Sequence, residues 1–286
     1  MNCIHFGDCR DIMRQWAAEG VKVQTCVTSP PYFGLRDYGH ERQIGLEQTP
    51  ETYIAAMVEV FRCVRDVLAD DGTLWVNIGD SYARQGGKVS EQSRHWDGRE
   101  HDPGAMHATR HVDNMPGYKP KDLIGIPWML AFALRADGWY LRQDIIWHKP
   151  NPMPESVRDR CTKAHEYIFL LSKSERYYFD SEAIAEKAVG SGETRNRRSV
   201  WTVTTKPYKG AHFATFPPDL IEPCILAGAR KGDIVIDPFM GSGTTAQVAV
   251  QHGRQYLGCE LNKEYEELQK NRLKGLQYDL MGAIHG

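Results

Sequence analysis

The sequence has no pair of cysteines with the spacing of a zinc ribbon or a redox motif. Its seven cysteines are Cys3, Cys9, Cys26, Cys63, Cys161, Cys224 and Cys259. Their number is odd, no two of them are separated by two residues, and the first nine residues contain no apolar run of the signal-peptide kind. We therefore expect a protein of a reducing, cytoplasmic compartment whose thiols pack as small apolar groups.

A strong net charge and a long apolar run are also missing. Lys plus Arg is 35 and Asp plus Glu is 37, so the formal net charge is -2. A nucleic-acid partner would therefore have to be met by a local basic patch. No stretch of about 18 apolar residues is present, so no membrane span is expected. The 286 residues, 41% of them hydrophobic, exclude a collagenous or mostly disordered chain and suffice for one large domain or two small ones.

Short apolar runs alternate with helical patterns along the chain. Strands are predicted over 3–7, 23–27, 73–78, 140–147, 166–171, 234–236 and 256–259. Helices are predicted up to Trp16, from Pro50 to the stop at Asp71-Gly72, over 123–135 and 219–229, up to Val250, and from Glu264. Thr49 is the expected N-cap of the second helix, with Pro50 at its first position. The alternation predicts an α/β domain with a mostly parallel sheet.

Two segments interrupt this pattern. Residues 84–119 are polar and lack periodicity, and the spacing of their histidines matches no zinc site, so no metal is expected. These histidines are His95, His101, His107 and His111. Residues 187–210 hold six basic residues and one acidic residue, a net charge of +5, with Trp201 interleaved. Such a run is either a solvated face or a surface for nucleic acid.

A glycine-rich turn follows the predicted strand at 234–236. Gly241 and Gly243 permit a tight turn and close approach of the backbone to a ligand. Glu260 ends the next strand, 19 residues after Gly241, a spacing that suits a carboxylate accepting hydrogen bonds from ribose hydroxyls. No Gly-Lys-Ser/Thr is present, and the third glycine of the dinucleotide fingerprint is missing, with Gln247 near its place. An adenosine ligand without pyrophosphate fits better, and a plain strand-to-helix turn is the alternative.

The segment Thr28-Ser29-Pro30-Pro31-Tyr32 ends another predicted strand. The two prolines make the backbone rigid and leave it with carbonyl acceptors in place of N–H donors. Tyr32 adds a flat face beside the Ser29 hydroxyl. The segment could hold the amino group of a ring while stacking on the ring, or it could be a proline-rich turn with a packed tyrosine.

Together the two motifs resemble those of the amino-methylating DNA methyltransferases, which use S-adenosylmethionine. Their order, Ser-Pro-Pro-Tyr before Asp-Pro-Phe-Met-Gly-Ser-Gly, is similar to the β-type arrangement of that family. The resemblance covers nearly the whole chain and implies a Rossmann-like methyltransferase fold with circularly permuted motif order. It implies a mostly parallel seven-stranded sheet with helices on both faces. We expect one catalytic domain over 1–286, with 84–119 as a polar insertion and 181–210 as a candidate target-recognition segment.

The resemblance also implies roles for individual residues. The expected cofactor-binding residues are Asp8, Phe216, Asp237, Phe239, Gly241, Ser242, Gly243, Thr244 and Glu260. Among these, Asp8 would meet the adenine amino group, Glu260 the ribose, and the glycine-rich turn the methionine part. The expected catalytic residues, which would hold the target base, are Ser29, Pro30, Pro31 and Tyr32. The candidate DNA-binding residues are Lys149, Arg195, Arg197, Arg198, Trp201 and Lys209.

The implied substrate is double-stranded DNA with its target base flipped out of the stack. No Pro-Cys pair is present, which argues against methylation at carbon 5 of cytosine. Ser29 resembles the cytosine-N4 members of the family, whereas adenine-N6 members more often have Asp or Asn there. Cytosine N4 is therefore favoured and adenine N6 is the alternative. An RNA or protein methyltransferase and a non-catalytic DNA-binding module are the rival hypotheses.

The resemblance also bears on partners and location. It implies a bacterial or phage-encoded protein of the cytoplasm, associated with the nucleoid while it acts. It leaves open whether the chain forms a homodimer and whether it works beside a cognate restriction nuclease.

Overall fold

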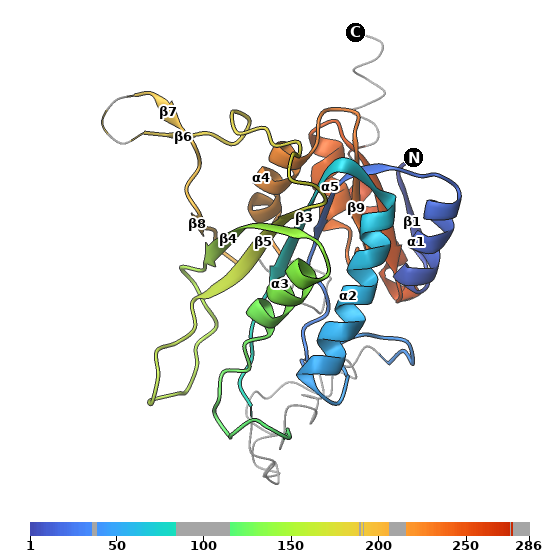
Figure 1. Cartoon of the computed structure of the whole chain (residues 1–286). Helices are drawn as coiled ribbons and strands as arrows, with labels where there is room; N and C mark the ends of the chain where they lie inside the picture. Colours follow the sequence, from blue (N-terminus) through green and yellow to red (C-terminus); the bar gives the residue numbers. More distant parts are fainter. Residues whose placement is uncertain are drawn as a thin grey trace.

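The computed structural model describes residues 1–35, 39–83, 115–188, 190, 192–205, 216–274 and 276. The strands of the central sheet are β1 (Cys3–Phe6), β2 (Val23–Thr28), β3 (Leu68–Ile78), β4 (Tyr140–His148), β5 (His165–Ser172), β8 (Val200–Thr202), β9 (Ile234–Asp237) and β10 (Gln255–Glu260). Two short strands, β6 (Glu186–Lys187) and β7 (Thr194–Arg195), pair apart from it. The central order is β1-β10-β9-β2-β3-β5-β4-β8 (Figure 1). Only β5 runs antiparallel to its neighbours, so the predicted mostly parallel sheet is confirmed.

The sheet has eight strands where seven were expected. The additional strand, β8, lies parallel to the outer side of β4, with Trp201 paired to Trp147. It comes from the segment predicted to recognise the target. Its three residues are too few to show a period of two, but the burial of Trp201 holds them against the sheet.

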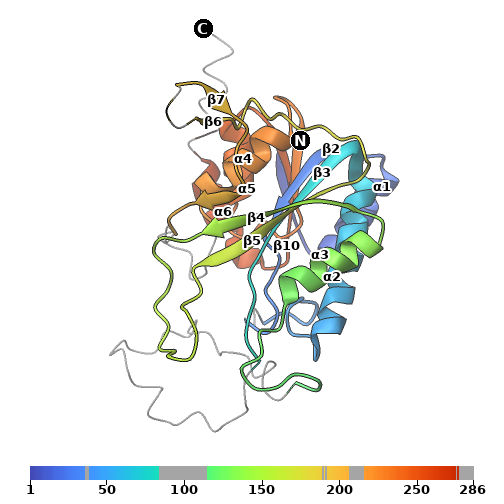
Figure 2. The same cartoon turned by 60° about the vertical axis from the view of Figure 1, so that its left-hand side comes forward.

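The helices form one layer on each face of this sheet. They are α1 (Cys9–Ala18), α2 (Pro50–Val67), α3 (Ile126–Ala136), α4 (Pro218–Gly228), α5 (Thr244–Gln251), the short 3-10 helix η3 (Lys263–Tyr265) and α6 (Glu266–Leu273). The first three pack their apolar faces on one side of the sheet, and α4 and α5 pack on the other (Figure 2). The prediction of helices on both faces is therefore confirmed. Among the described residues, no helix is both long and apolar enough to cross a membrane.

Helix α2 begins where its capping residues predict. The Thr49 hydroxyl accepts a hydrogen bond from the Thr52 amide at 3.2 Å, the Thr52 hydroxyl closes the capping box, and Pro50 starts the helix. Its predicted end at Asp71-Gly72 is wrong. Leu68 is fully buried, is already extended and pairs with Val23, so β3 starts there.

The sheet order brings distant parts of the sequence to one edge. Strands β2 and β9 are parallel neighbours, with Cys26 paired to Ile236. Strands β1 and β10 are also parallel neighbours, with Phe6 paired to Glu260. Because parallel strands end at the same edge, the segments that follow these four strands meet there, where ligands bind in open α/β sheets. The predicted insertion at 84–119 lies outside the described residues except for 115–119, and the single-domain assignment stays a prediction.

Candidate active site

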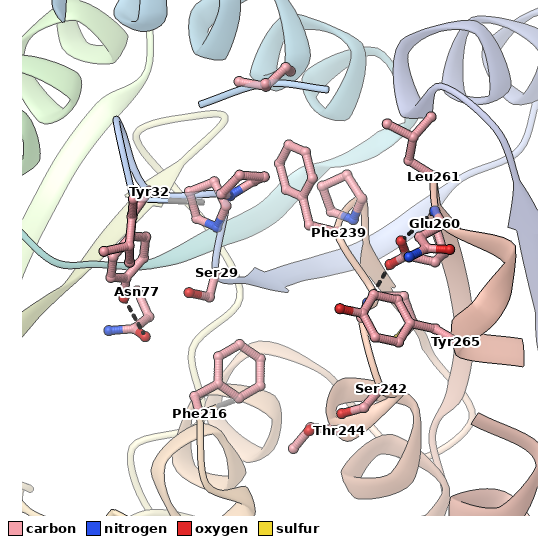
Figure 3. A pocket seen from close by; sticks show the side chains of 18 of the residues that line it. Ser29, Tyr32, Asn77, Phe216, Phe239, Ser242, Thr244, Glu260, Leu261 and Tyr265 are labelled. Carbon is pink, nitrogen blue, oxygen red and sulfur yellow. Dashed lines mark hydrogen bonds between the residues drawn. The ribbon is translucent and has the colours of Figure 1, made fainter. Parts of the chain in front are cut away.

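A cavity of about 820 Å³ opens at this edge of the sheet. Segments that follow β1, β2, β9 and β10 line it together. Figure 3 shows Ser29 and Tyr32 on one side of the cavity, Glu260 and Tyr265 on the opposite side, and Phe239 between them. Sites for small molecules measure about 300–1,000 Å³, so the space suffices for one such ligand at either end. We call the side of Ser29 the base end and the side of Glu260 the cofactor end.

The glycine-rich turn forms the floor of the cofactor end. Gly241 and Gly243 have φ values of 53° and 87°, in the left-handed region that side chains disfavour. The side chain of Gln269 from α6 donates to the Gly241 carbonyl at 2.7 Å and so holds the turn from outside. Gly243 is the N-cap of α5, whose first residue Thr244 lines the cavity. The N-terminus of a helix favours anionic groups.

Glu260 connects the two turns that border the cofactor end. Its carboxylate accepts a hydrogen bond from the Gly241 amide at 2.7 Å and another from the Asn262 amide at 2.8 Å. The side chain lines the cavity although the residue is only 8% exposed. Burial raises the pKa of Glu260 to about 7. Its charge therefore changes near neutral pH.

Ser242 is the clearest sign that this end accepts a polar ligand. Its hydroxyl is buried, lines the cavity and has no hydrogen-bond partner within the part of the chain that the structure describes. A buried polar atom without a partner costs about 1–3 kcal/mol. A bound carboxylate or amino group at this place would satisfy it. The residues present thus fit the amino-acid part of S-adenosylmethionine.

Asp237 lies beneath the turn and does not line the cavity. It is 1% exposed and accepts hydrogen bonds from the Thr28 hydroxyl at 2.6 Å, the Thr245 hydroxyl at 2.7 Å and the Phe239 amide at 3.0 Å. Burial raises the pKa of Asp237 to about 6. The expected contact with the cofactor is replaced by a positioning role, because this carboxylate ties β2 to the glycine-rich turn.

Asp8 lines the cavity and caps α1. It accepts from the Arg10 amide at 2.9 Å and forms ion pairs with Arg10 at 2.6 Å and Arg42 at 3.1 Å. Burial opposes ionisation, but hydrogen bonds from Arg10 outweigh it and lower the pKa of Asp8. Asp8, the residue predicted to contact the adenine, is thus an ionised carboxylate on the cavity wall, and it is paired with both Arg10 and Arg42.

The base end contains a polar network in which the predicted residues Tyr32 and Lys149 meet Asn77 and Glu166, which sequence reasoning missed. The Tyr32 hydroxyl donates to Glu166 at 2.7 Å, the Asn77 amide donates to the same carboxylate at 3.3 Å, and the Lys149 ammonium pairs with its other oxygen. Burial raises the pKa of Tyr32 well above its usual range, and the Glu166 carboxylate adds to the shift. Tyr32 therefore keeps its hydroxyl proton and acts as a donor.

The remaining predicted base-holding residues also lie at this end. Ser29, Pro30 and Pro31 line the cavity. The Tyr53 hydroxyl of α2 donates to the Pro31 carbonyl at 2.8 Å, which fixes the path of the proline pair. Phe216 faces the same cavity from the segment before α4 (Figure 3).

The basic segment is only partly available to DNA. Trp201 is 4% exposed and donates from its indole to the Arg198 carbonyl at 2.8 Å, so the prediction that it contacts DNA is wrong. The reason is its packing in the core beneath β8. Arg195 and Arg198 share the Glu186 carboxylate at 2.9 Å and 2.6 Å, and Arg197 lies 4.8 Å over the Trp201 ring. The three arginines do not line the cavity, and their contact with DNA stays a prediction.

Some predictions fall partly or wholly outside the described residues. Lys209 and the four histidines of the 84–119 insertion belong to this group. Within the described ranges, no group of three or more His, Cys, Asp or Glu side chains is placed to hold a metal ion.

Comparison with known proteins identifies close relatives. A protein-family model described as DNA methylase matches residues 23–271. The chain is 53% identical over 271 residues to the Type II methyltransferase M.Cfr9I of Citrobacter freundii, a match that covers 94% of this chain and 86% of that protein. It is 51% identical over 269 residues to the Type II methyltransferase M.SmaI of Serratia marcescens, with 93% and 89% covered.

Solved structures share the fold at lower identity. The cytosine-N4-specific PvuII DNA methyltransferase aligns with a TM-score of 0.67 and 20% identity, over 95% of this chain and 86% of that one. The complex of M1.HpyAVI with S-adenosylmethionine aligns with a TM-score of 0.60 and 18% identity, over 96% and 99%. The expected Rossmann-like methyltransferase fold is therefore confirmed.

Proposed function

Because the chain belongs to the DNA methylase family, it is a site-specific DNA amino-methyltransferase that uses S-adenosylmethionine, and we propose that it methylates N4 of cytosine. The observation that supports cytosine over adenine is the presence of Lys149 beside the predicted base-holding residues on the cavity wall. On its Watson–Crick edge, cytosine presents the acceptors N3 and O2 next to one another, whereas adenine presents N1 alone on that edge. The Lys149 ammonium supplies hydrogen-bond donors for such acceptors. Adenine N6 is the second candidate, since its amino group fits Ser29 equally well.

The base end activates the amino group by accepting its protons. The exocyclic nitrogen is a poor nucleophile, because its lone pair is delocalised into the ring. Hydrogen bonds from its two N–H groups to the Ser29 hydroxyl and the Pro30 carbonyl draw the lone pair out of conjugation. Stacking on Tyr32 is worth about 1–3 kcal/mol and offsets part of the cost of extruding the base.

The cofactor end orients the second reactant. S-adenosylmethionine supplies an electrophilic methyl group on its sulfonium. Glu260 would accept hydrogen bonds from the ribose hydroxyls of the cofactor. Ser242 and the N-terminus of α5 would hold its amino-acid part. The two ends face each other across Phe239 (Figure 3), so the residues contribute mainly by positioning the nitrogen in line with the methyl carbon.

Glu166 is the group we assign to proton removal. When the methyl group moves to the amino nitrogen, its bond to the sulfonium would break and leave a neutral thioether, and the nitrogen would have to lose one proton. The Glu166 carboxylate accepts a hydrogen bond from the Tyr32 hydroxyl at 2.7 Å. It is therefore linked directly to the side chain on which the base is proposed to stack. The proton would pass from the nitrogen to the Ser29 hydroxyl, from Ser29 to the Tyr32 hydroxyl, with which it shares a hydrogen bond, and from Tyr32 to Glu166.

The base assignment is tested by the product. Unmethylated plasmid DNA incubated with the enzyme and labelled S-adenosylmethionine should yield N4-methyldeoxycytidine after digestion and nucleoside mass spectrometry. N6-methyldeoxyadenosine in its place would overturn the assignment of the base and leave the activity class intact. Transfer of the label to RNA or protein with none in DNA would overturn the DNA substrate itself.

Gly79 makes room for Tyr32. A Cβ atom on Gly79 would lie 2.8 Å from Cε2 of Tyr32 and 3.3 Å from Glu166. We expect Gly79→Ala to push the tyrosine ring away from Glu166 and to lower the rate of methyl transfer at least about tenfold, which corresponds to roughly 1.4 kcal/mol. Equilibrium binding of the cofactor, measured by calorimetry, should stay unchanged, because Gly79 lies at the base end. An unchanged rate would show that the position of Tyr32 is not critical.

We also propose the functional setting. The relatives are named Type II methyltransferases, which supports a role beside a restriction nuclease that cuts the same site. A homodimer, a cytoplasmic location and nucleoid association stay predictions.

A further inference from the structure

The connection between β4 and β5 carries an exposed methionine at the rim of the cavity. Met153 is 86% exposed and lines the cavity from a segment that extends well beyond the sheet (Figure 1). Single exposed apolar side chains are common and need no explanation. Met153 differs because, although exposed, it lines the same cavity as Ser29.

The backbone around Met153 is stiff. Prolines stand on both sides of it, at 152 and 154, and a third is at 150. Each proline fixes its own φ and restricts the residue before it. A methionine that only filled space in a mobile loop would not need such a frame. The prolines fix the backbone that carries this flexible apolar side chain.

The same segment is tied to the protein at its base. The Lys149 amide donates to the Ala164 carbonyl at 2.8 Å, which closes the connection. The Asn151 side chain exchanges two hydrogen bonds with the backbone of Thr205, at 3.0 Å and 3.3 Å. Met153 therefore projects from an anchor only two residues away. Lys149, at the start of the segment, belongs to the network that positions Tyr32.

The charge of the segment suits a nucleic-acid backbone. Arg158 is exposed and has no ion-pair partner among the described residues, whereas Arg160 pairs with Glu155 and lies 3.9 Å over the Tyr82 ring. A guanidinium without an ion-pair partner, on the same connection as Met153, can contact a phosphate of a nucleic acid.

We propose that Met153 is the wedge that enters the DNA duplex where the target base leaves it, with Arg158 on the flanking phosphate. Apolar side chains, methionine among them, insert between bases in other DNA-bending proteins and compensate the lost stacking. The unbranched thioether adapts to an irregular gap. This inference rests on the base-flipping step of the proposed function, and the test below separates the two.

The test compares a paired target with one that is already loosened. The site is first located by sequencing the methylated product. Single-turnover rates are then measured on a duplex with the normal pair and on one with a mismatch opposite the target base. We expect Met153→Ala to lower the rate on the paired duplex about tenfold and to leave the rate on the mismatched duplex within about twofold of wild type, because a mismatched base costs less to extrude.

Control variants keep the outcome interpretable. Phe132→Ala removes another exposed apolar side chain, 46% exposed on α3 and outside the cavity lining, and should leave both rates unchanged. Arg158→Ala should weaken DNA binding equally for both duplexes. Cofactor affinity and melting temperature of Met153→Ala should match wild type. A wild-type rate on the paired duplex, or an equal loss on both duplexes, would overturn the wedge. Failure of the wild-type enzyme to methylate either duplex would instead count against the proposed function.

Discussion

Ser29→Ala should lower the single-turnover rate of methyl transfer about 10²-fold, the loss typical when one group that stabilises developing charge is removed. In the proposed mechanism, the hydroxyl of Ser29 accepts a hydrogen bond that strengthens as the amino nitrogen becomes positive in the transition state. Ser29 lies at the base end, across the cavity from Glu260 and Tyr265 (Figure 3). The dissociation constant for S-adenosylmethionine should therefore stay within about twofold of wild type, since only transition-state stabilisation is removed.

The measurement needs rapid quenching with labelled cofactor and excess enzyme, so that product release does not hide the chemical step. Ser81→Ala is a matched control, because Ser81 is also half-buried near the same edge of the sheet but does not line the cavity. It should retain the wild-type rate. If Ser29→Ala lost cofactor binding together with the rate, the separate roles assigned to the two ends of the cavity would be wrong.

Local signals in the sequence predicted correctly those features of the structure that depend only on neighbouring residues. Thr49 and Pro50 predicted the start of α2, since capping and proline geometry act within one turn. The two motifs lie at strand ends because continuous apolar runs stop where the chain leaves the sheet. The two motifs lie close together because the carboxyl ends of parallel strands lie at the same edge of a sheet. No particular contact between them had to be known.

Contacts between distant segments were not predictable in the same way. Glu166 lies near the start of the antiparallel strand β5, so it reaches the edge where the neighbouring parallel strands end. Nothing in its own segment indicates that direction. Asn77 lies inside an apolar run, and its role became visible only in the structure, where its side chain donates a hydrogen bond to Glu166. Asp237 occupies a motif position but points beneath the turn, because two threonines and one amide satisfy it there.

Trp201 shows the limit of composition. A basic segment with an aromatic residue predicted a surface for DNA, yet the pairing of β8 with β4 buries the indole. The gain from burying a large apolar side chain outweighed the polar character of its neighbours. Exposure, which decides whether an aromatic residue binds a partner, is a property of the packed fold.

Affinity for S-adenosylmethionine should rise with pH between about 5 and 8 and then level off. Burial raises the pKa of Glu260 to about 7, and in the proposed site the ribose hydroxyls donate hydrogen bonds to its ionised carboxylate. Cofactor binding should therefore release a proton below about pH 7, where the free carboxyl is mostly protonated. Glu260→Gln should weaken binding about 10- to 100-fold, the range expected for one hydrogen bond to a charged group, and should abolish the proton release.

The same pKa sets the sign of the effect on stability. The folded protein holds the Glu260 proton more tightly than the unfolded chain does, whose pKa is near 4.5. The contribution of this proton to the free energy of unfolding is complete below about pH 4.5 and is lost as the pH rises through 7. The ligand-induced rise in melting temperature should accordingly be larger at pH 8 than at pH 6.

Calorimetry in two buffers of different ionisation enthalpy measures the released proton directly. Asp237 is also buried, with a pKa of about 6, and its charge adds to the rise in the pKa of Glu260, but it does not line the cavity. Glu267→Gln, at an exposed position on α6, should behave as wild type. Proton release that persisted in Glu260→Gln would assign the titration to another group and remove Glu260 from the ribose site.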